Sequence, residues 1–423
     1  MTDGSTGGHY DAGLLEPEAL AVARRLNAFA TIAMAPGAEH GPLAGGTAAI
    51  KDSIDVAGMP TSAGGSRPVV ALRDAAVVRR LKNAGVTVVG KASMDEWGLG
   101  VTGYSPALGQ CRNPWDPARM SGGSSSGAAA AVAAGLATIG LGTDSAGSLR
   151  IPASLCGVSA LKPSAGSVSM RGVLRIAPTL DVVGPIARSV VDCAAADSAI
   201  RAAGRPSGTP IRRVGIARGP HWSVVADDVG QAIDTAQHTL ETDGIRLADI
   251  DVPEVDVATR LNGVVLLYEL AHRHRQRWRA ERGRLGRRVV RQLELGAAIS
   301  EAEYREALQF RERWRERLDK LFGTVDALWH ATTATTAPRV DERVSTASMT
   351  QLCAAWNLAG VPVLALPVGF GRDGLPVGAS LVGPAGSEAA LLELGMRYQR
   401  LTDWHLRRPP VWGAPATTIG GPT

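Results

Sequence analysis

Apolar residues recur at helical spacing in some stretches of the chain and as short β-branched runs in others. The first half alternates between these two patterns, with glycines and prolines at the boundaries. Helices are predicted over residues 14–32, 74–83 and 126–135, and strands over residues 47–51, 86–89 and 136–142. Asp74 is the predicted N-cap of the second helix, and Gly85 follows it as a stop.

The second half is dominated by helices. Residues 258–322 look helical throughout, and Ser300 with Glu303 forms the sequence pattern of a capping box. The buried stripe of the helix that follows is predicted to consist of Ala307, Phe310, Trp314, Leu318 and Leu321. Strand-like runs return at residues 325–329 and 361–368.

Predicted strands at both ends of the chain, with helices between them, favour one sheet assembled from distant segments. The sequence therefore predicts an α/β fold with a single large domain, a mixed β-sheet flanked by helices on both faces. This domain is expected to span residues 14–408. The polar, Gly-rich residues 1–13 and the Pro- and Gly-rich residues 409–423 are expected to be flexible ends.

Composition excludes several classes of protein. The chain has 423 residues, of which 45% are hydrophobic and 20% charged, so it is neither a disordered chain nor a disulfide-stapled peptide. No window is apolar enough for a membrane span, and the first residues lack a signal-peptide pattern, so we expect a cytoplasmic protein. The four cysteines have no metal or redox spacing and are expected to be free thiols.

The net charge of +5 is a property of one segment. Residues 273–320 hold 15 basic and 8 acidic residues, so the rest of the chain sums to −2. An arginine-rich stretch at residues 272–288 resembles a nucleic-acid surface, but a solvated helix in an arginine-biased protein explains it better. Only five of the 45 basic residues are lysines, so each lysine invites a specific reason.

The most informative stretch runs from residue 121 to residue 163 and contains two Gly/Ser turns, each followed by a helix-like segment. Either turn alone would be explained as an ordinary loop between two elements. Together they bring the Ser148 hydroxyl and several consecutive amide donors towards one point, which is what acyl transfer requires. A base is still needed, and Lys51 ends an apolar strand where burial would lower its pKa. A snorkelling lysine at a strand end is the alternative.

Two similar motifs are set aside. The segment 123–127 matches the G-x-S-x-G nucleophile elbow with Ser125 at its centre, but the preceding segment 111–120 contains two prolines and makes a poor strand. A phosphate-binding P-loop would need a G-K-[ST] sequence after the glycines, and none follows.

With these motifs the chain resembles the amidase signature family, whose members are hydrolases with a Ser–cis-Ser–Lys triad. The resemblance is carried by the segments KDSIDVAGMPTSAG, GGSSSG and GTDSAGSLRIPASLCGVSALKP, and further by RNPWD and TLDVVGPIARSV. It covers about residues 43–398. In motif form the chain looks more like allophanate-hydrolase-like amidases of small amides than like the glutamine-dependent transamidase subunit.

The resemblance implies a role for each matching residue. Ser148 would be the acyl nucleophile, Ser124 the bridging serine after a cis peptide bond, and Lys51 the base. The oxyanion hole would be formed by backbone N–H groups of Ser145, Ala146, Gly147 and Ser148, with Thr143 and Asp144 bracing the turn and Ser125 helping to hold the lysine. Ala146 stands where many members have glycine, so a positive φ there would be penalised.

Three further residues are candidates for substrate binding. The resemblance places Trp97 and Asn357 beside the scissile carbonyl, although a core aromatic and a cap amide are the plainer interpretations. Arg311 lies at the edge of a buried helical stripe and would either grip a substrate carboxylate or be one surface arginine among many.

The predicted function is hydrolysis of a C–N amide bond of a small substrate through an acyl-serine. No metal or other cofactor, nucleic acid or membrane partner is expected, and a homodimer is possible. The alternative is a transamidase-like glutaminase subunit that supplies ammonia to a partner.

Overall fold

One mixed sheet runs through the whole protein, which is described by a computed structural model that places residues 9–10, 16–202, 208–281 and 283–412. Over these residues the sheet has 12 strands, and the single-domain α/β architecture predicted from the sequence is confirmed. In spatial order the strands are β1 (His9–Tyr10), β2 (Phe29–Ala35), β6 (Thr87–Ala92), β3 (Thr47–Lys51), β9 (Ile139–Asp144), β11 (Val182–Ala187), β10 (Ser159–Lys162), β15 (Val363–Phe370), β16 (Pro376–Val382), β14 (Ala327–Ala331), β12 (Arg213–Arg218) and β13 (Arg246–Asp251).

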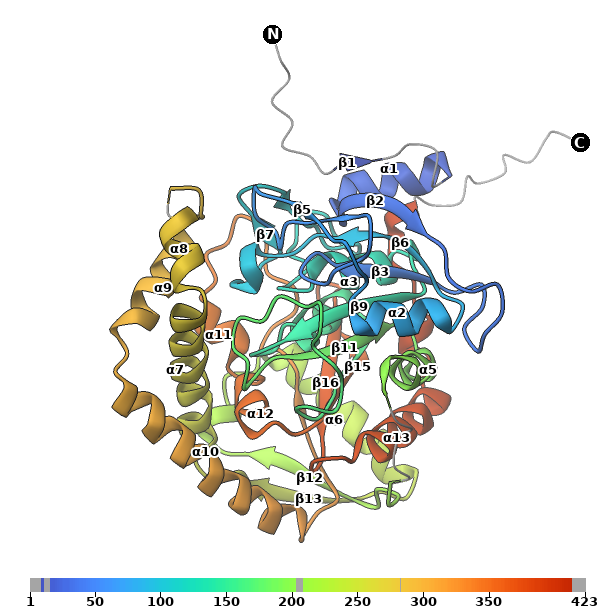
Figure 1. Cartoon of the computed structure of the whole chain (residues 1–423). Helices are drawn as coiled ribbons and strands as arrows, with labels where there is room; N and C mark the ends of the chain where they lie inside the picture. The colour runs from blue at the N-terminus through green and yellow to red at the C-terminus, as the bar shows by residue number, and fades with distance from the viewer. Residues whose placement is uncertain (1–8, 11–15, 203–207, 282, 413–423) are drawn as a thin grey trace, which may run out of the picture.

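Helices cover the sheet and form an outer layer beside it. They are α1 (Pro17–Leu26), α2 (Ala76–Asn83), α3 (Ser126–Ala133), α4 (Arg150–Cys156), α5 (Val190–Ile200), α6 (Asp227–Thr242), α7 (Val255–Arg273), α8 (Arg275–Glu281), α9 (Arg287–Ala298), α10 (Glu301–Phe322), α11 (Thr346–Thr350), α12 (Ala354–Ala359) and α13 (Glu388–Leu401). Figure 1 shows α7 to α10 gathered on one side of the molecule and α2, α5 and α13 on the other.

The two faces of the sheet follow from the alternation of side chains along each strand. In β3, Ala49 packs in the cluster under α3, whereas Ala48 and Ile50 pack in the cluster under α2 and α5. Lys51 is the next residue, so the alternation turns its side chain to the α3 face. Apart from one valine, helix α3 is built of alanines, glycine and serine, and it lies directly on β3, β9 and β11 because such small side chains permit close approach.

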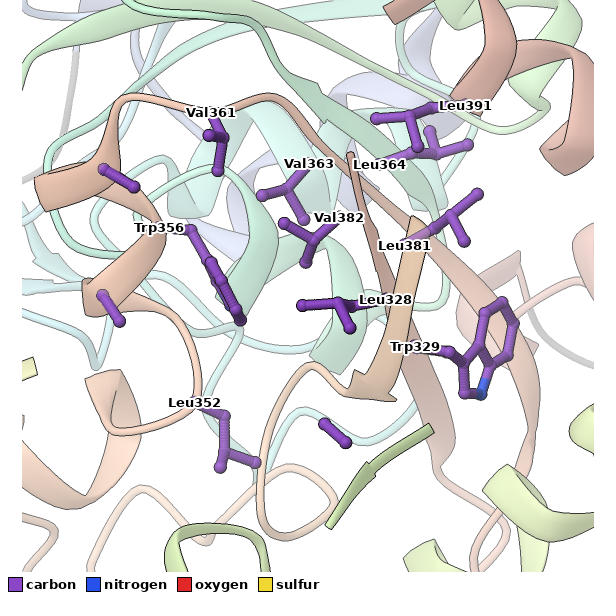
Figure 2. Close-up of a cluster of buried hydrophobic side chains, with 14 of the residues drawn as sticks. Leu328, Trp329, Leu352, Trp356, Val361, Val363, Leu364, Leu381, Val382 and Leu391 are labelled. Carbon is purple, nitrogen blue, oxygen red and sulfur yellow. The ribbon is translucent and has the colours of Figure 1, made fainter. Parts of the chain in front are cut away.

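The C-terminal half of the sheet has a large apolar core on both faces. Figure 2 shows Trp356 beside Leu328, Val363 and Val382, which are neighbours across β14, β15 and β16. Trp329, Leu364 and Leu381 alternate to the opposite face, where Leu391 of α13 lies beside Leu364. This packing fixes the helices that border the site, because α12 also contacts α7 and α10.

Most predicted elements are present, with shifted boundaries. The capping box at Ser300 and Glu303 is confirmed, and Ala307, Phe310, Trp314 and Leu318 are buried along α10 while Leu321 is half-buried. Residues 258–322 form four helices.

The prediction of one helix over residues 14–32 was wrong at its C-terminal end. Helix α1 stops at Leu26, Asn27 adopts a left-handed conformation (φ 49°), and strand β2 follows. Pairing of β2 with β6 outweighs the local helical spacing. Asp74 is not the N-cap of α2 either, since Ala75 occupies that position and the Asp74 carboxylate accepts from the Ala57 N–H and pairs with Lys82.

Short parts of both predicted flexible ends belong to the fold. His9–Tyr10 pair with β2 as a parallel strand, and Pro410–Trp412 form a helical turn in which Val411 is buried against the α3 cluster. Residues 1–8, 11–13 and 413–423 of the predicted ends lie outside the described residues. All four cysteines are buried free thiols, as predicted. Among the described helices, none combines the length and apolarity that spanning a bilayer requires.

Candidate active site

Lys51 and Thr143 meet because they lie at the carboxyl ends of neighbouring parallel strands. Strands β3 and β9 pair in register with Ile50 opposite Leu141, so their carboxyl ends lie side by side. Lys51 Nζ donates to Thr143 Oγ1 at 2.8 Å and to Ser124 Oγ at 2.8 Å. The lysine is fully buried and Ser124 is 1% exposed. The structure thus joins Lys51 to Ser124 inside the protein, out of contact with bulk water.

Burial lowers the pKa of Lys51 from 10.5 to about 7. Desolvation is the main cause, because the charged ammonium loses its water shell. The carboxylates of Asp95, Asp144 and Asp181 act against it by favouring the charged form. A large fraction of Lys51 is therefore neutral near pH 7, and a neutral amine is able to accept a proton.

Ser124 follows a cis peptide bond from Gly123, at the turn that leads into α3. Ser125, the next residue, connects this turn to the second Gly/Ser turn by hydrogen bonds. The Ser125 N–H donates to the carbonyl oxygen of Ser148 at 3.1 Å, and the Ser125 hydroxyl donates to the carbonyl oxygen of Thr143 at 3.2 Å. Ser125 therefore holds Thr143, which in turn contacts Lys51. The two Gly/Ser turns singled out in the sequence are thus adjacent in space.

Ser148 stands at the start of the segment that leads into α4. It is half-buried, and its hydroxyl makes no hydrogen bond to any of the described residues, including Ser124. Its side chain lines a large cavity, as do Ser145 and Ala146. The serine that the sequence singled out as a nucleophile is thus the one that is open to a ligand, whereas Ser124 is enclosed.

The turn before Ser148 offers backbone donors. Across the ranges that the structure describes, the N–H groups of Ser145, Ala146 and Ser148 have no hydrogen-bond acceptor. The Gly147 N–H differs from the expectation, because it donates to Asp144 Oδ1 at 2.6 Å and so holds the turn in shape. Gly147 also carries the positive φ of this turn (123°), and Ala146 does not, so alanine at position 146 is not strained.

Asp144 is the centre of a buried ionic network. Its carboxylate accepts from Arg150 Nε at 2.9 Å and from the Leu149 N–H at 3.2 Å, besides the Gly147 N–H. Burial by itself would raise the pKa of Asp144, but the guanidinium of Arg150 beside it holds this pKa well below its usual range. The carboxylate stays charged and fixes the backbone on both sides of Ser148.

A second carboxylate supports the other side of the turn. Ser145 Oγ donates to Asp181 Oδ1 at 2.5 Å, and Asp181 Oδ2 accepts from the N–H groups of Ile176 and Ala177. Burial raises the pKa of Asp181 to about 6. Asn262 of α7 donates to the Ser145 carbonyl oxygen at 3.3 Å, which ties the outer helical layer to the turn.

The cavity that Ser148 lines has a volume of about 810 Å³. Its walls come from the segment 98–101, the turn 145–148, one face of α7, and residues of α9 and of the segment 346–354. Much of this lining is aliphatic, and its apolar members are Leu99, Val101, Ala146, Ile176, Leu266, Leu267, Leu295, Ala347 and Ala354. A pocket of this size and character suits a small organic ligand.

The three candidate substrate residues lie in different places. Trp97 is buried beside Ser124 and borders a small hollow there, with Arg277 over its ring at 4.5 Å. Asn357 is buried away from the cavity and bridges Arg150 and Asp144, so both ends of its amide are occupied. Arg311 is not brought to the site, because its guanidinium pairs with Glu312 on α10.

Sequence reasoning missed several residues that the fold brings to the site. Asp181 lies within TLDVVGP, a segment that resembles the amidase signature family but that suggested no role for the aspartate. Arg150 lies within the long central motif. Asp95 is buried, receives the Gly103 N–H, and pairs with Arg288 of α9 at 3.2 Å. No spacing in the sequence connects Asp95 with Arg288, since they belong to segments far apart in the chain.

The site combines hydroxyls, backbone amides and an amine with the buried Asp144, Arg150 and Asp181. The described residues contain no group of three or more His, Cys, Asp or Glu side chains arranged to hold a metal ion. The arginine-rich segment is partly engaged within the protein, because Arg277 covers Trp97 and Arg288 pairs with Asp95.

Comparison with known proteins shows the family of this chain. The Amidase family model matches residues 12–392. The chain belongs to the amidase family. It is 37% identical to a glutamyl-tRNA(Gln) amidotransferase subunit from Chloroflexus aurantiacus, over 88% of this chain and 86% of that protein.

Solved structures show the same fold. A crystal structure of an amidase superposes with a TM-score of 0.83 at 31% identity and covers 90% of this chain and 94% of its own. The allophanate hydrolase of Kluyveromyces lactis superposes with a TM-score of 0.79 at 28% identity, over 85% of this chain and 62% of that one.

Proposed function

We propose that this protein cleaves the C–N bond of an amide through an acyl-serine intermediate on Ser148. The observation that carries the proposal is the 2.8 Å contact between Lys51 Nζ and Ser124 Oγ in a fully buried setting. A serine hydroxyl attacks a carbonyl only when a base takes its proton, and the neutral amine of Lys51 is such a base.

The proton moves along a relay. Neutral Lys51 accepts the Ser124 hydroxyl proton, Ser124 accepts the Ser148 proton, and Ser148 Oγ forms a bond to the amide carbon. The N–H groups of Ser145, Ala146 and Ser148 hold the negative oxygen of the tetrahedral intermediate. The relay then returns a proton to the leaving nitrogen, and the C–N bond breaks.

The second half of the reaction repeats these steps with water. Water gives a proton to the relay as its oxygen attacks the acyl carbon, and Ser148 regains a proton as the acid leaves. In the overall reaction, one amide and one water give one carboxylic acid and one ammonia or amine. The residues named supply the base, the nucleophile and the oxyanion donors.

Two fates for the released ammonia are open to this chemistry. Curated relatives such as the Chloroflexus aurantiacus protein are named as amidotransferase subunits, which supports the transamidase-like alternative more than independent hydrolysis of small amides. In that role the ammonia would pass to a partner protein. A stand-alone amidase is the second candidate, favoured by the aliphatic cavity and by the similar solved structure of an amidase.

The test of the reaction is capture of the acyl-enzyme. Incubation with a primary amide, followed by rapid acid quench and peptide mass analysis, should place one acyl group on Ser148. Ser148→Ala should abolish both the adduct and ammonia release, whereas Ser223→Ala, which removes an exposed hydroxyl elsewhere, should keep both. Ammonia release by Ser148→Ala at the parent rate would overturn the proposal.

Ammonia release by the purified chain, measured without any partner protein, distinguishes the transamidase-like subunit from the stand-alone amidase. A transamidase-like subunit should release ammonia slowly by itself and faster in the presence of its partner proteins. Full turnover of small amides by the isolated chain, without any partner effect, would instead establish the stand-alone amidase.

A further inference from the structure

Within the described part of the chain, one cation in the cavity beside Ser148 has no partner. Arg260 of α7 lines the cavity together with Ser148, and over the described ranges it is the only lysine or arginine that does so. Its guanidinium makes no ion pair or hydrogen bond with any described residue. This sets it apart from Arg277 and Arg288, which pair with Glu281 and Asp95.

The position of Arg260 relative to the turn at Ser148 follows from helix geometry. Asn262, two residues later on α7, donates to the carbonyl oxygen of Ser145. A helix rises about 1.5 Å per residue, and its long side chains lean towards its N-terminus. Arg260 therefore lies about 3 Å along the helix axis from Asn262, towards the N-terminus of α7, and its side chain leans further the same way.

The two ends of this wall differ in polarity. Thr259, which adjoins Arg260 in α7, donates to the Gln351 carbonyl oxygen in the cavity wall, and His221 contacts the same oxygen. Burial lowers the pKa of His221, so it adds no competing positive charge near pH 7. At the opposite end, Leu266 and Leu267 of α7 face the cavity with Leu295 of α9.

One acidic side chain accompanies Arg260. Asp256 lies one helical turn before it and also lines the cavity, yet the two do not form an ion pair. An exposed guanidinium that is not neutralised by its neighbour is available to a carboxylate, which it binds through paired N–H donors. Asp256 weakens this attraction but leaves the donors free.

We infer that the substrate is an amide whose acyl group also carries a carboxylate, and that Arg260 binds this carboxylate. This inference rests on the proposed amide cleavage at Ser148 and names the class of acyl group accepted there. The scissile carbonyl lies in the turn at residues 145–148, and the carboxylate reaches the guanidinium at the polar end of the cavity. Arg260 is thus a binding residue that selects the substrate.

The experiment compares three primary amides of one chain length with the whole purified chain, together with its partner proteins if these are required. Adipic acid monoamide carries a terminal carboxylate, hexanamide is neutral, and 6-aminohexanamide carries an ammonium. The ratio of kcat/KM for adipic acid monoamide to that for hexanamide should be about tenfold or more, because hydrogen bonds to charged groups are the stronger ones. 6-Aminohexanamide should be the poorest of the three.

Variants then assign the preference to one side chain. Arg260→Gln should reduce this ratio to about one, mainly through the KM of the anionic amide, and Arg260→Glu should turn the preference towards 6-aminohexanamide. Arg313→Gln removes an exposed arginine of α10 outside the cavity and should keep the parent ratio. Thermal unfolding of each variant confirms that it is folded.

The outcomes separate this inference from the proposed function. A parent ratio of one, or a ratio that Arg260→Gln leaves unchanged, would overturn the role of Arg260 while acyl-Ser148 still forms. Failure of all three amides and of the primary amides used above to acylate Ser148 would instead overturn the amide cleavage itself.

Discussion

Arg288 of α9 places its guanidinium 3.2 Å from the buried carboxylate of Asp95, which lies against the residue that precedes Ser124. A Cβ on Gly123 would overlap Asp95 Oδ2, so glycine is required there by contact. Asp95 is also the first of the three carboxylates that raise the pKa of Lys51. An ion pair between distant segments therefore lies beside Lys51 and Ser124, and its carboxylate favours the charged form of Lys51.

Asp95→Asn should make Lys51 easier to deprotonate. The amide keeps the size of the side chain but removes a negative charge that favours the ammonium, so the pKa of Lys51 falls. The acid limb of the pH profile of kcat/KM should move to lower pH by a fraction of a unit or more. Asp341→Asn, at an exposed position, should leave the limb in place. A limb that moves to higher pH would contradict this interpretation.

The activity of the unaltered protein should rise with pH through about 7. Lys51 must be neutral to accept a proton, its pKa is lowered to about 7, and the neutral fraction therefore grows as the pH increases past that value. The measurement is kcat/KM for a neutral amide between about pH 5 and 9. Lys51→Met should reduce kcat by roughly 10³-fold or more at every pH. A profile that is highest below about pH 6 would rule out Lys51 as the base.

Asp144→Ala should destabilise the fold strongly. It leaves Arg150, which is fully buried, without its carboxylate, and an unpaired buried charge costs about 3–5 kcal/mol of unfolding free energy. Urea unfolding followed by far-UV circular dichroism measures the change. The matched control is Asp249→Ala, since Asp249 pairs with Arg218 at a similar distance but at the surface. That variant should lose less than about 1 kcal/mol, and equal losses would contradict the argument.

Gly127→Ala should weaken the packing of α3 on the sheet. An ideal Cβ there would overlap the carbonyl oxygen of Ala28 and the Ser93 nitrogen, and both atoms belong to the backbone. Overpacking of this kind costs about 1–3 kcal/mol. Gly230→Ala in α6 meets nothing within 4 Å and should stabilise the protein by about 0.5–1 kcal/mol. The test is the melting temperature of each variant, which should fall for Gly127→Ala and rise for Gly230→Ala.

Local patterns predicted the elements that local forces control. The capping box at Ser300 depends on residues three apart, and the strand at 47–51 is set by a short apolar run between turns, so both appear as expected. Residues 29–32 were misassigned because their helical spacing was outweighed by pairing with β6, a contact with residues far along the chain. Pairing partners of this kind are not encoded in any short window.

For this chain, the sequence alone determined the chemical inventory of the site: which hydroxyls, which amine, and which small residues allow two turns to approach each other. Only the tertiary structure decided how these groups behave. It removed water from Lys51, directed the Gly147 N–H to Asp144, and left Arg260 open in the cavity. The reason is that solvation and charge depend on every segment packed around an atom, and those segments are distant in the chain.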